Sequence, residues 1–496
     1  MRWAPFFHFY QPADQQPDIL EAVAVQSYRP LLKGFQKHKQ VRLTLNITGA
    51  LLELFDKYQY RDLIDILREL GKEGRIEFTS SSKYHAILPF LDKKEIARQI
   101  QINDETNNFF LGSAYSPRGF FPPEMAYDSK LDAVLEGLGF DWIILDEIAC
   151  GGEVGKIDYT KIYTIKGKKL GVYFRERRLS NLIMSSVVRS RETLINAMQD
   201  DLRSNRFVIT AMDGETFGHH RPGLEKMLFD IFETPECEFI RISDIQKYYK
   251  KIIEVSPTAS TWASSEQDIK RGIQFISWAD PENIIHQWQK EFTKLVLREV
   301  QSMDKQNSQY AQIRMQMDKA LSSDHFFWAC AKPWWSVEMI ELGAYLLLSA
   351  IRQIPNVSQE KLAQATVYYE KIISTAFEWQ RTKKIWQMMR DQGEAVRIPF
   401  KERTLEKGGV EKGVYHAFIQ MMKRLEREAR KRREYEQAIL WRDAIYKLQH
   451  KHDVYDTINV IDLLRTKIPH DEVEKTLDRY TDQYRKIRGG QPEQRG

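Results

Sequence analysis

The amino-acid sequence predicts an α/β protein in which a barrel of parallel strands is followed by an α-helical C-terminal region. Over residues 1–290, short apolar runs alternate with amphipathic helical patterns, as is typical of a parallel sheet with helices between its strands. Seven apolar runs of strand length favour a barrel. After about residue 290, the apolar residues recur at helical spacing instead.

The expected elements follow one another in chain order. The predicted strands lie at residues 4–9, 41–47, 75–79, 119–121, 142–145, 171–174 and 207–212. Helical patterns separate several of these strands, as at residues 51–70 and 130–139, the second of which closes on a glycine stop signal. Long helices rich in Leu and Ala are expected at residues 291–319 and 320–354, and charged helices from about residue 414.

These patterns divide the chain into three predicted domains. We expect a barrel at residues 1–290, a helical domain packed on it at residues 291–400, and a charged helical hairpin with a disordered tail at residues 401–496. The hairpin segment REYEQAILWRDAIYKLQ resembles a protein-docking hairpin of bacterial excision-repair subunits, although an ordinary charged helix explains it equally well. A protein partner is therefore one interpretation of this region. The basic run KRLEREARKRR is usually a solvated helix face, so we do not expect a nucleic-acid partner.

Composition and cysteine usage indicate a soluble protein of the cytoplasm. The chain has 496 residues and a formal net charge of only +5. Its three cysteines, Cys150, Cys237 and Cys330, are odd in number and far apart, which argues against a disulfide framework. Neither a secretory signal nor an apolar run of membrane-spanning length is visible.

Polar clusters follow directly on the predicted strands. Examples are the segment from His8 to Gln11, Glu77 with His85, Asp146 with Glu147, Arg175 to Arg178, and Asp213 to His220. In a parallel barrel the carboxyl ends of the strands meet at one face, where active sites lie. The clusters therefore predict a catalytic site at that face.

Two carboxylates in these clusters suit the cleavage of glycosidic bonds. Glu124 lies in GFFPPEMAYD, where a strand meets a proline-stiffened turn, and Asp213 follows the apolar strand of FVITAMDGETFGHH. A nucleophile and a proton donor are what such cleavage requires. Each motif alone has a simpler explanation, because Glu124 could serve a helix N-terminus and Asp213 could belong to a turn. Their common position at strand ends favours the catalytic interpretation.

Four motifs in order resemble those of glycoside hydrolase family 57, whose members are retaining enzymes that act on α-glucans. They are HFYQP, GRIEFTSSSKYHAILP, GFFPPE and MDGETFGHH, and further similarity in LGVYFRERRLSNLI, SWADPENIIHQWQ and HFFWACAKPWW extends the resemblance to about residue 350. The resemblance implies a distorted (β/α)7 barrel, with Glu124 as nucleophile and Asp213 as general acid/base. It implies hydrolysis or transglycosylation of α-1,4 or α-1,6 bonds, with a carboxylate separation of roughly 5 to 5.5 Å and a raised pKa for Asp213.

The resemblance also implies which residues contact the sugar. His8 and Gln11 should lie on the cavity floor and donate hydrogen bonds to sugar hydroxyls. The family's second histidine is replaced by Tyr10, which cannot carry a positive charge, and an aromatic position that is often tryptophan is Phe121. The expected substrate-binding residues are His8, Tyr10, Gln11, Glu77, His85, Phe121, Asp146, His219, His220, Trp262 and Trp278.

Two of these assignments have alternatives. His219 and His220 with an aspartate could suggest the metal site of similar deacetylase barrels, but the chain lacks a His-x-x-x-His pair, so we expect neither a metal nor another cofactor. Trp262 and Trp278 could line glycan subsites or belong to the core. For the whole protein, a glucan-binding or partner-recruiting role with a weakened site competes with the enzymatic interpretation because of Tyr10 and the charged tail.

Overall fold

The computed structural model describes residues 1–184, 188, 190–332, 334–391 and 412–450, together with positions 464, 468 and 472. The chain forms two compact units. The first contains residues 1–180, 198–215 and 231–397, and the second contains residues 181–197, 216–230 and 398–496.

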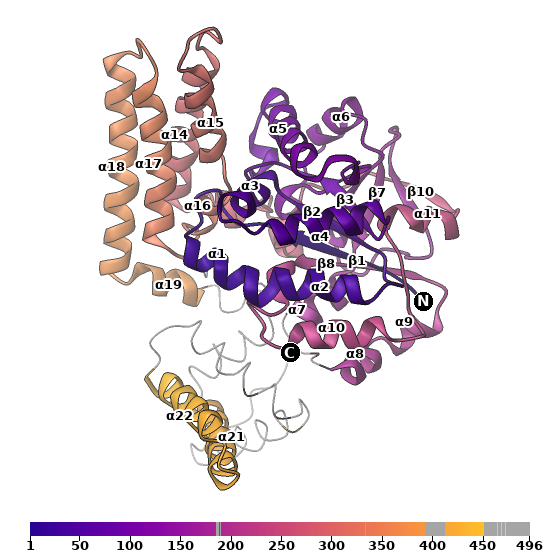
Figure 1. Cartoon of the computed structure of the whole chain (residues 1–496). Helices are drawn as coiled ribbons and strands as arrows, with labels where there is room; N and C mark the ends of the chain where they lie inside the picture. Colours follow the sequence, from indigo (N-terminus) through magenta and orange to yellow (C-terminus); the bar gives the residue numbers. More distant parts are fainter. Residues whose placement is uncertain are drawn as a thin grey trace. The chain divides into compact units, whose positions relative to one another are not determined.

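A curled, mostly parallel sheet forms the centre of the first unit (Figure 1). Seven of its strands pair in parallel in the order β8-β1-β2-β3-β4-β5-β7. They are β1 (Arg2–Phe9), β2 (Leu43–Ile47), β3 (Ile76–Ser80), β4 (Gly119–Phe120), β5 (Trp142–Asp146), β7 (Gly171–Arg175) and β8 (Phe207–Asp213). Each predicted strand is therefore present.

Three short strands were not predicted. β6 (Ile162–Ile165) pairs antiparallel with β7, β10 (Ile252–Val255) pairs with β6, and β9 (Glu238–Phe239) pairs with the start of β1. β6 and β10 extend the edge of the sheet beyond β7, whereas β9 pairs with the first residues of β1. None of them lies among the polar clusters that follow the seven parallel strands.

The seven parallel strands almost close into a barrel. Between the outer strands β7 and β8, the backbone N–H of Glu176 donates to the carbonyl of Ile209 at 2.8 Å, and the Arg175 Nε–H donates to the carbonyl of Ala211 at 2.8 Å. No continuous ladder joins these two strands among the described residues. The predicted distorted (β/α)7 barrel is thus confirmed.

The local sequence explains why these segments form strands and helices. β5 reads WIILD and is buried throughout, as expected for a strand covered on both faces. In α4 (Arg61–Lys72), Leu63, Leu67 and Leu70 recur at helical spacing and are buried. Gly119 is required in β4, because a Cβ atom there would lie 2.1 Å from the ring of Trp142.

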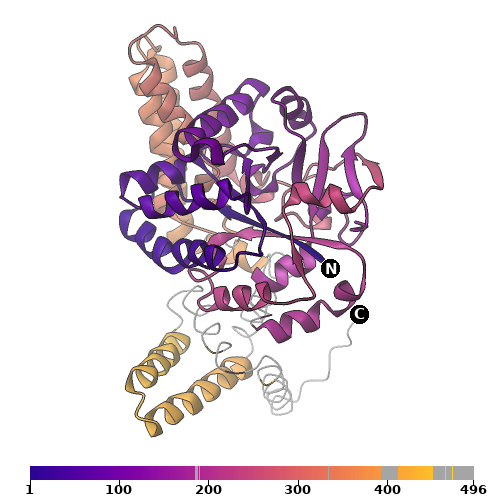
Figure 2. The same ribbon diagram turned by 45° about the vertical axis from the view of Figure 1, so that its right-hand side comes forward.

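Helices cover the outer face of the sheet (Figure 2). Those that follow the early strands are α1 (Pro17–Val23), α2 (Arg29–Lys37), α3 (Gly49–Lys57), α4, α5 (Lys93–Leu111) and α6 (Lys130–Gly137). Shorter helices follow, namely α7 (Arg177–Met184), α8 (Arg191–Ala197), α9 (Gln199–Arg203), α10 (Leu224–Phe232), α11 (Ile245–Tyr248), α12 (Glu266–Lys270) and α13 (Ile276–Ala279).

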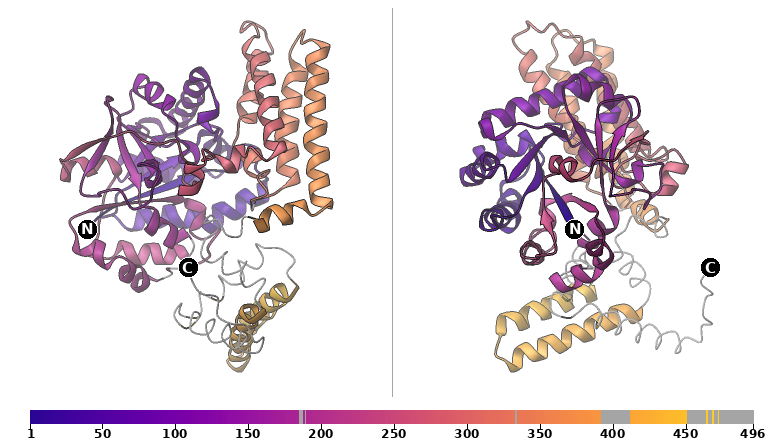
Figure 3. Two further views of the ribbon diagram at one scale, coloured as in Figure 1. Left: turned by 180° about the vertical axis from the view of Figure 1, so that it is seen from behind. Right: turned by 90° about the vertical axis from the view of Figure 1, so that its right-hand side faces the viewer.

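Long helices form the rest of the first unit and lie side by side in Figures 1 and 3. They are α14 (Ile284–Gln301), α15 (Tyr310–Ala320), α17 (Val337–Gln353) and α18 (Gln359–Arg381), with the short α16 (Asp324–Phe327) and α19 (Lys384–Asp391) at their ends. One apolar core joins barrel residues such as Phe121 to Ile285, Leu347 and Ile372 in these helices. The helical region is confirmed, and because it shares this core, its status as a separate domain stays a prediction.

The described part of the second unit includes a helical hairpin. Its helices are α21 (Lys412–Lys431) and α22 (Tyr435–His450), and they pack through Phe418, Met422, Trp441 and Leu448. The predicted disordered tail lies outside the described residues. Across the described residues, no helix has the length and apolar character that a membrane crossing requires.

Candidate active site

The carboxyl ends of neighbouring strands bring four of the predicted site residues together. His8 of β1 lies in register with Asp213 of β8 on one side and with Asn46 of β2 on the other. His85 follows β3, and its ring contacts that of His8. Glu124 follows β4, with an oxygen 3.9 Å from Nδ1 of His85. These four residues therefore lie together at the strand ends, and their role as a catalytic site stays a prediction.

Glu124 has an unusual backbone conformation. Its φ is +60°, and that of the next residue, Met125, is +48°. Such angles cost a residue with a side chain about 1–3 kcal/mol and occur where surrounding contacts hold them, often at functional sites. Here the N–H of Trp262 donates to the Glu124 carbonyl at 3.1 Å, and the indole N–H of Trp262 donates to Glu124 Oε2 at 2.7 Å. One oxygen of the carboxylate is thus held and the other faces His85.

The second carboxylate, Asp213, has a different environment. No described residue donates a hydrogen bond to its carboxylate. Burial raises the pKa of Asp213 to about 6, against the opposing effect of the positive charge of Arg175. Burial and the proximity of Asp213 raise the pKa of Glu124 to about 8, although the hydrogen bond from Trp262 lowers it. The pKa of Asp213 shifts in the direction expected from the sequence.

A chain of hydrogen bonds fixes both histidines at the centre of the site. Asn46 donates its amide hydrogens to Thr79, so its Oδ1 accepts from Nδ1 of His8 at 2.8 Å. His8 Nε2 is then the acceptor of a 3.1 Å bond from His85 Nε2, and His85 Nδ1 accepts from the Ser323 hydroxyl at 2.8 Å. Burial lowers the pKa of His8 to about 4 and that of His85 well below its ordinary value, so both rings are neutral.

This chain of hydrogen bonds limits the contacts that His8 can make with a sugar. Both ring nitrogens of His8 are engaged by the protein, so a hydrogen bond to a sugar hydroxyl would require one of these bonds to be exchanged. Phe121 lies under the same ring, with centroids 4.6 Å apart, and also packs against Trp262. The direct sugar contacts of His8 and Phe121 stay predictions.

Gln11 binds a carboxylate that sequence analysis did not single out. Its amide donates to Glu215 Oε1 at 3.2 Å and to the hydroxyl of Tyr28 at 3.3 Å, while the Tyr28 hydroxyl donates to Glu215. Burial and the proximity of Asp213 raise the pKa of Glu215 to about 8. The Asp-Gly-Glu sequence was the available signal, but only Asp213 was chosen from it. Gln11 thus connects the end of β1 to the loop that follows β8.

Tyr10 also has a carboxylate partner that was missed. Its hydroxyl donates to Asp324, which accepts a second hydrogen bond from Ser322 at 2.5 Å, and its ring stacks on His85 with centroids 4.1 Å apart. Asp324 lies just before the aromatic group that begins at His325 and was not recognised, because nothing in the sequence links it to Tyr10. Its negative charge adds to the raised pKa of Glu124.

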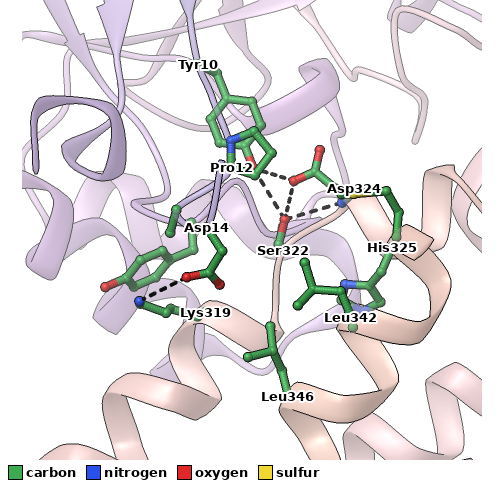
Figure 4. Close-up of a pocket in the computed structure, with 13 residues that line it drawn as sticks. Tyr10, Pro12, Asp14, Lys319, Ser322, Asp324, His325, Leu342 and Leu346 are labelled. Atoms are coloured by element: carbon green, nitrogen blue, oxygen red, sulfur yellow. Dashed lines mark hydrogen bonds and ion pairs between the residues drawn. The ribbon is translucent and has the colours of Figure 1, made fainter. Parts of the chain in front are cut away.

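A small pocket lies beside Tyr10 and Asp324 (Figure 4). Tyr10, Ser322 and Asp324 form its polar wall, and an ion pair of 3.5 Å between Lys319 and Asp14 lies at another edge. The remaining lining residues are Pro12, Ala13, Tyr84, His325, Met339, Leu342, Gly343 and Leu346.

Three residues predicted to bind substrate lie outside the group formed by His8, His85, Glu124 and Asp213. The Asp146 side chain has no exposed surface and pairs with Arg175 at 2.7 Å and with Arg177 at 2.7 Å. Glu77 lies one layer deeper in the barrel, in register with Thr44, where its carboxylate accepts from Thr44 and from the backbone of Ser243. Trp278 packs in an apolar cluster with Ile87 and Phe326. These contacts support structural roles for all three.

His219 and His220 belong to the second unit, where their rings contact each other with centroids 5.3 Å apart. Their predicted position at the cavity rim stays a prediction. The structure contains no group of three or more His, Cys, Asp or Glu side chains arranged for a metal ion within its described residues.

Comparison with known proteins agrees with this geometry. The model of glycosyl hydrolase family 57 matches residues 10–259, which is half of the chain and includes the loops that carry Glu124 and Asp213. The chain belongs to glycosyl hydrolase family 57. This family 57 protein is 24% identical over 226 residues to an alpha-amylase of Pyrococcus horikoshii, covering 45% of this chain and 35% of the relative.

Further relatives have other activities. A 4-alpha-glucanotransferase of Thermococcus kodakarensis is 24% identical over 294 residues, covering 56% of this chain and 44% of the relative. The chain thus spans less than half the length of these two curated relatives. A family 57 branching enzyme of Thermococcus kodakaraensis shares the fold with a TM-score of 0.58 and 15% identity, over 74% of this chain and 94% of that one. A 4-alpha-glucanotransferase of Thermococcus litoralis has a TM-score of 0.55 and 16% identity, over 71% of this chain and 60% of that one.

Proposed function

We propose that the protein is a glycosyl hydrolase or transglycosylase that cleaves α-glucans with retention of anomeric configuration. The observation that carries the proposal is that Glu124 and Asp213, two partly buried carboxylates, lie at strand ends beside the contacting rings of His85 and His8, and the charge of Asp213 acts on the pKa of Glu124. Family membership supports the reaction class. The relatives named amylase and 4-alpha-glucanotransferase support α-glucan as the substrate class.

In the proposed double displacement, Glu124 attacks the anomeric carbon while Asp213 protonates the departing oxygen. Asp213 then removes a proton from water or from a sugar hydroxyl, which displaces Glu124 from the covalent glycosyl-enzyme. The contacts of the two acids suit these roles. Trp262 holds one oxygen of Glu124, and Asp213 has no described hydrogen-bond partner with which a substrate oxygen would compete. The mechanism requires roughly 5 to 5.5 Å between the two carboxyl groups.

A second candidate function is glucan binding with little turnover. The double displacement needs the proton on Asp213 and a negative charge on Glu124, yet the pKa of Glu124 is raised to about 8 and that of Asp213 to about 6. Between these values, one proton is shared by the pair and resides mainly on Glu124, which is the opposite of the productive distribution. Tyr10, which replaces a family histidine, adds no positive charge that would favour the ionised form of Glu124.

One experiment separates the two functions. The full chain is incubated with maltooligosaccharides, glycogen and pullulan beside Glu124→Gln and Asp213→Asn, and products are resolved by chromatography. The enzyme hypothesis predicts products from the unaltered chain alone. Intact-protein mass spectrometry with 5-fluoro-α-glucosyl fluoride should add one glycosyl unit that Glu124→Gln does not acquire. Glucan binding without products or labelling would leave only the second candidate.

A further inference from the structure

We infer that Arg177 is a positioning residue for Glu124 and acts on it through the turn at residues 261–264 and the side chain of Trp262. Arg177 lies in the run RERR after β7, to which the proposed mechanism assigns no role. The inference uses the proposed function only in treating Glu124 as the nucleophile. The hydrogen bonds that carry it do not depend on any activity.

The guanidinium of Arg177 binds three acceptors at once. Its Nε–H donates to Asp146 at 2.8 Å, one Nη donates to the carbonyl of Ser264 at 2.8 Å, and the other donates to the carbonyl of Trp262 at 3.0 Å. Asp146 is wholly buried and is itself fixed by Arg175. Arg177 therefore ties the turn to a rigid, charged anchor at the end of β5.

This arrangement requires the fork geometry of arginine. Two carbonyls and a carboxylate lie around one planar group, and a lysine ammonium presents no matching set of donors in fixed directions. The turn has some internal hydrogen bonds, such as that from the N–H of Ser264 to the carbonyl of Thr261 at 3.1 Å. Those bonds shape the turn, and backbone bonds between Ser260 and Tyr127 hold the residue before it, whereas Arg177 ties the carbonyls within the turn to Asp146 at the end of β5.

The turn at residues 261–264 holds Glu124 at two points. The N–H and the indole N–H of Trp262 bind its carbonyl and its carboxylate, respectively. The backbone contact supports the left-handed conformation of Glu124, and the indole contact stabilises its negative charge. A displaced turn would therefore both misplace the carboxylate and raise its pKa further.

Other groups around Glu124 cannot substitute for this contact. His85 is neutral and lies 3.9 Å away, whereas Asp213 and Asp324 are negative and disfavour ionisation. Tyr10 is a neutral phenol with a raised pKa. Arg175 is committed to Asp146, and its guanidinium lies 6.0 Å from the ring centre of Trp262. Trp262 is the group that favours the charged form of Glu124 among these neighbours.

The test is a double-mutant cycle of Arg177→Met and Trp262→Phe with two readouts. The first is the pKa of Glu124, measured by NMR titration of protein labelled with ¹³C at the glutamate carboxyl carbons and assigned with Glu124→Gln. The second is kcat/KM against pH on a maltooligosaccharide. Each single variant should raise the pKa of Glu124, move the alkaline limb, which Glu124 sets, to higher pH and lower kcat/KM about tenfold to hundredfold, since the lost hydrogen bond is to a charged group.

The decisive comparison is between the effect of Arg177→Met in the unaltered protein and its effect when Trp262 has already been replaced. In the Trp262→Phe background, Arg177→Met should shift the pKa of Glu124 by less than about half a unit and change kcat/KM by less than about threefold, because the indole contact with the carboxylate is already gone and only the backbone contact remains. Equal effects of Arg177→Met in both backgrounds, or an unchanged pKa in Arg177→Met, would overturn the inference. Arg29→Met, which removes an exposed ion pair with Asp62, is the control and should leave both readouts unchanged.

Arg177→Lys is a second variant that keeps the test possible if Arg177→Met does not fold. Lysine keeps a positive charge beside Asp146 but cannot bridge both carbonyls, so a folded Arg177→Lys protein should still raise the pKa of Glu124. Full recovery by lysine would mean that charge alone matters and would also overturn the inference. If the unaltered protein has no turnover, the proposed function fails, but the titration still decides the role of Arg177.

Discussion

The strands β5 and β8 both end in an aspartate, yet the two carboxylates have opposite surroundings. Asp146 at the end of β5 has no exposed surface and is paired with Arg175 and Arg177. Asp213 at the end of β8 accepts no hydrogen bond from any described residue, and burial raises its pKa. Position at a strand end therefore does not determine the role of an acid. Its partners do, because both oxygens of Asp146 are held by arginines and neither is left for a substrate.

The largest expected effect is on catalysis at β8. Asp213→Asn keeps the shape of the side chain but removes its ability to transfer a proton, so kcat should fall about a thousandfold or more. Thermal unfolding should be little changed, because the carboxylate has no described hydrogen-bond partner to lose. A chromatographic assay and a melting curve on the same preparation check both. Retained activity would show that another group supplies the proton.

The same substitution at the end of β5 should lower the stability of the protein rather than its catalytic rate directly. Asp146→Asn leaves the buried Arg175 and the partly buried Arg177 without their counter-charge, so the free energy of unfolding should fall by about 3–5 kcal/mol. Denaturant unfolding measures this loss. If Asp146→Asn were as stable as the unaltered chain while its activity fell, Asp146 would act on the substrate directly and the contrast with Asp213 would be wrong.

The pH dependence sharpens the comparison further. With pKa values near 8 for Glu124 and 6 for Asp213, the pair holds one proton between these limits, two below them and none above. Turnover needs one proton, so kcat/KM should peak near pH 7 and fall about tenfold per pH unit on either side. Asp146→Asn, if it folds, should move only the alkaline limb to higher pH, because it weakens the anchor of Arg177. An optimum near pH 4 would mean that the acids are not perturbed as described.

The smallest expected effect concerns Tyr10. Replacing it by histidine places a group that can become positive beside Asp324, which now receives a neutral hydrogen bond from the phenol. A positive neighbour should lower the pKa of Glu124 and raise kcat/KM a few fold, on the order of 1 kcal/mol. Steady-state kinetics of Tyr10→His beside Tyr10→Phe measure this. Equal rates in both variants would mean that charge at this position is irrelevant.

The sequence predicted the arrangement of strands better than the partners of individual residues. Strand segments and polar strand ends were recognisable because burial and alternation with helices leave regular patterns. The pairing of Asp146 with Arg177 was not, since it depends on how neighbouring loops fold over the strand ends. Asp324 and Trp262 approach Glu124 from segments more than a hundred residues away, and spacing along the chain contains no information on that approach. The contacts of Glu77 with Thr44 and Ser243 were likewise not recognisable, and its predicted contact with substrate stays a prediction.

The row Asn46, His8, His85 and Ser323 has a direction, since every hydrogen in it points the same way. An extra proton on His8 would make two N–H groups face each other and break the row at its bond with His85, whereas the Ser323 hydroxyl could turn to accept from His85. Since burial lowers the pKa of His8 to about 4, the row stays intact near neutral pH and would break only in acid, next to the carboxylate of Glu124.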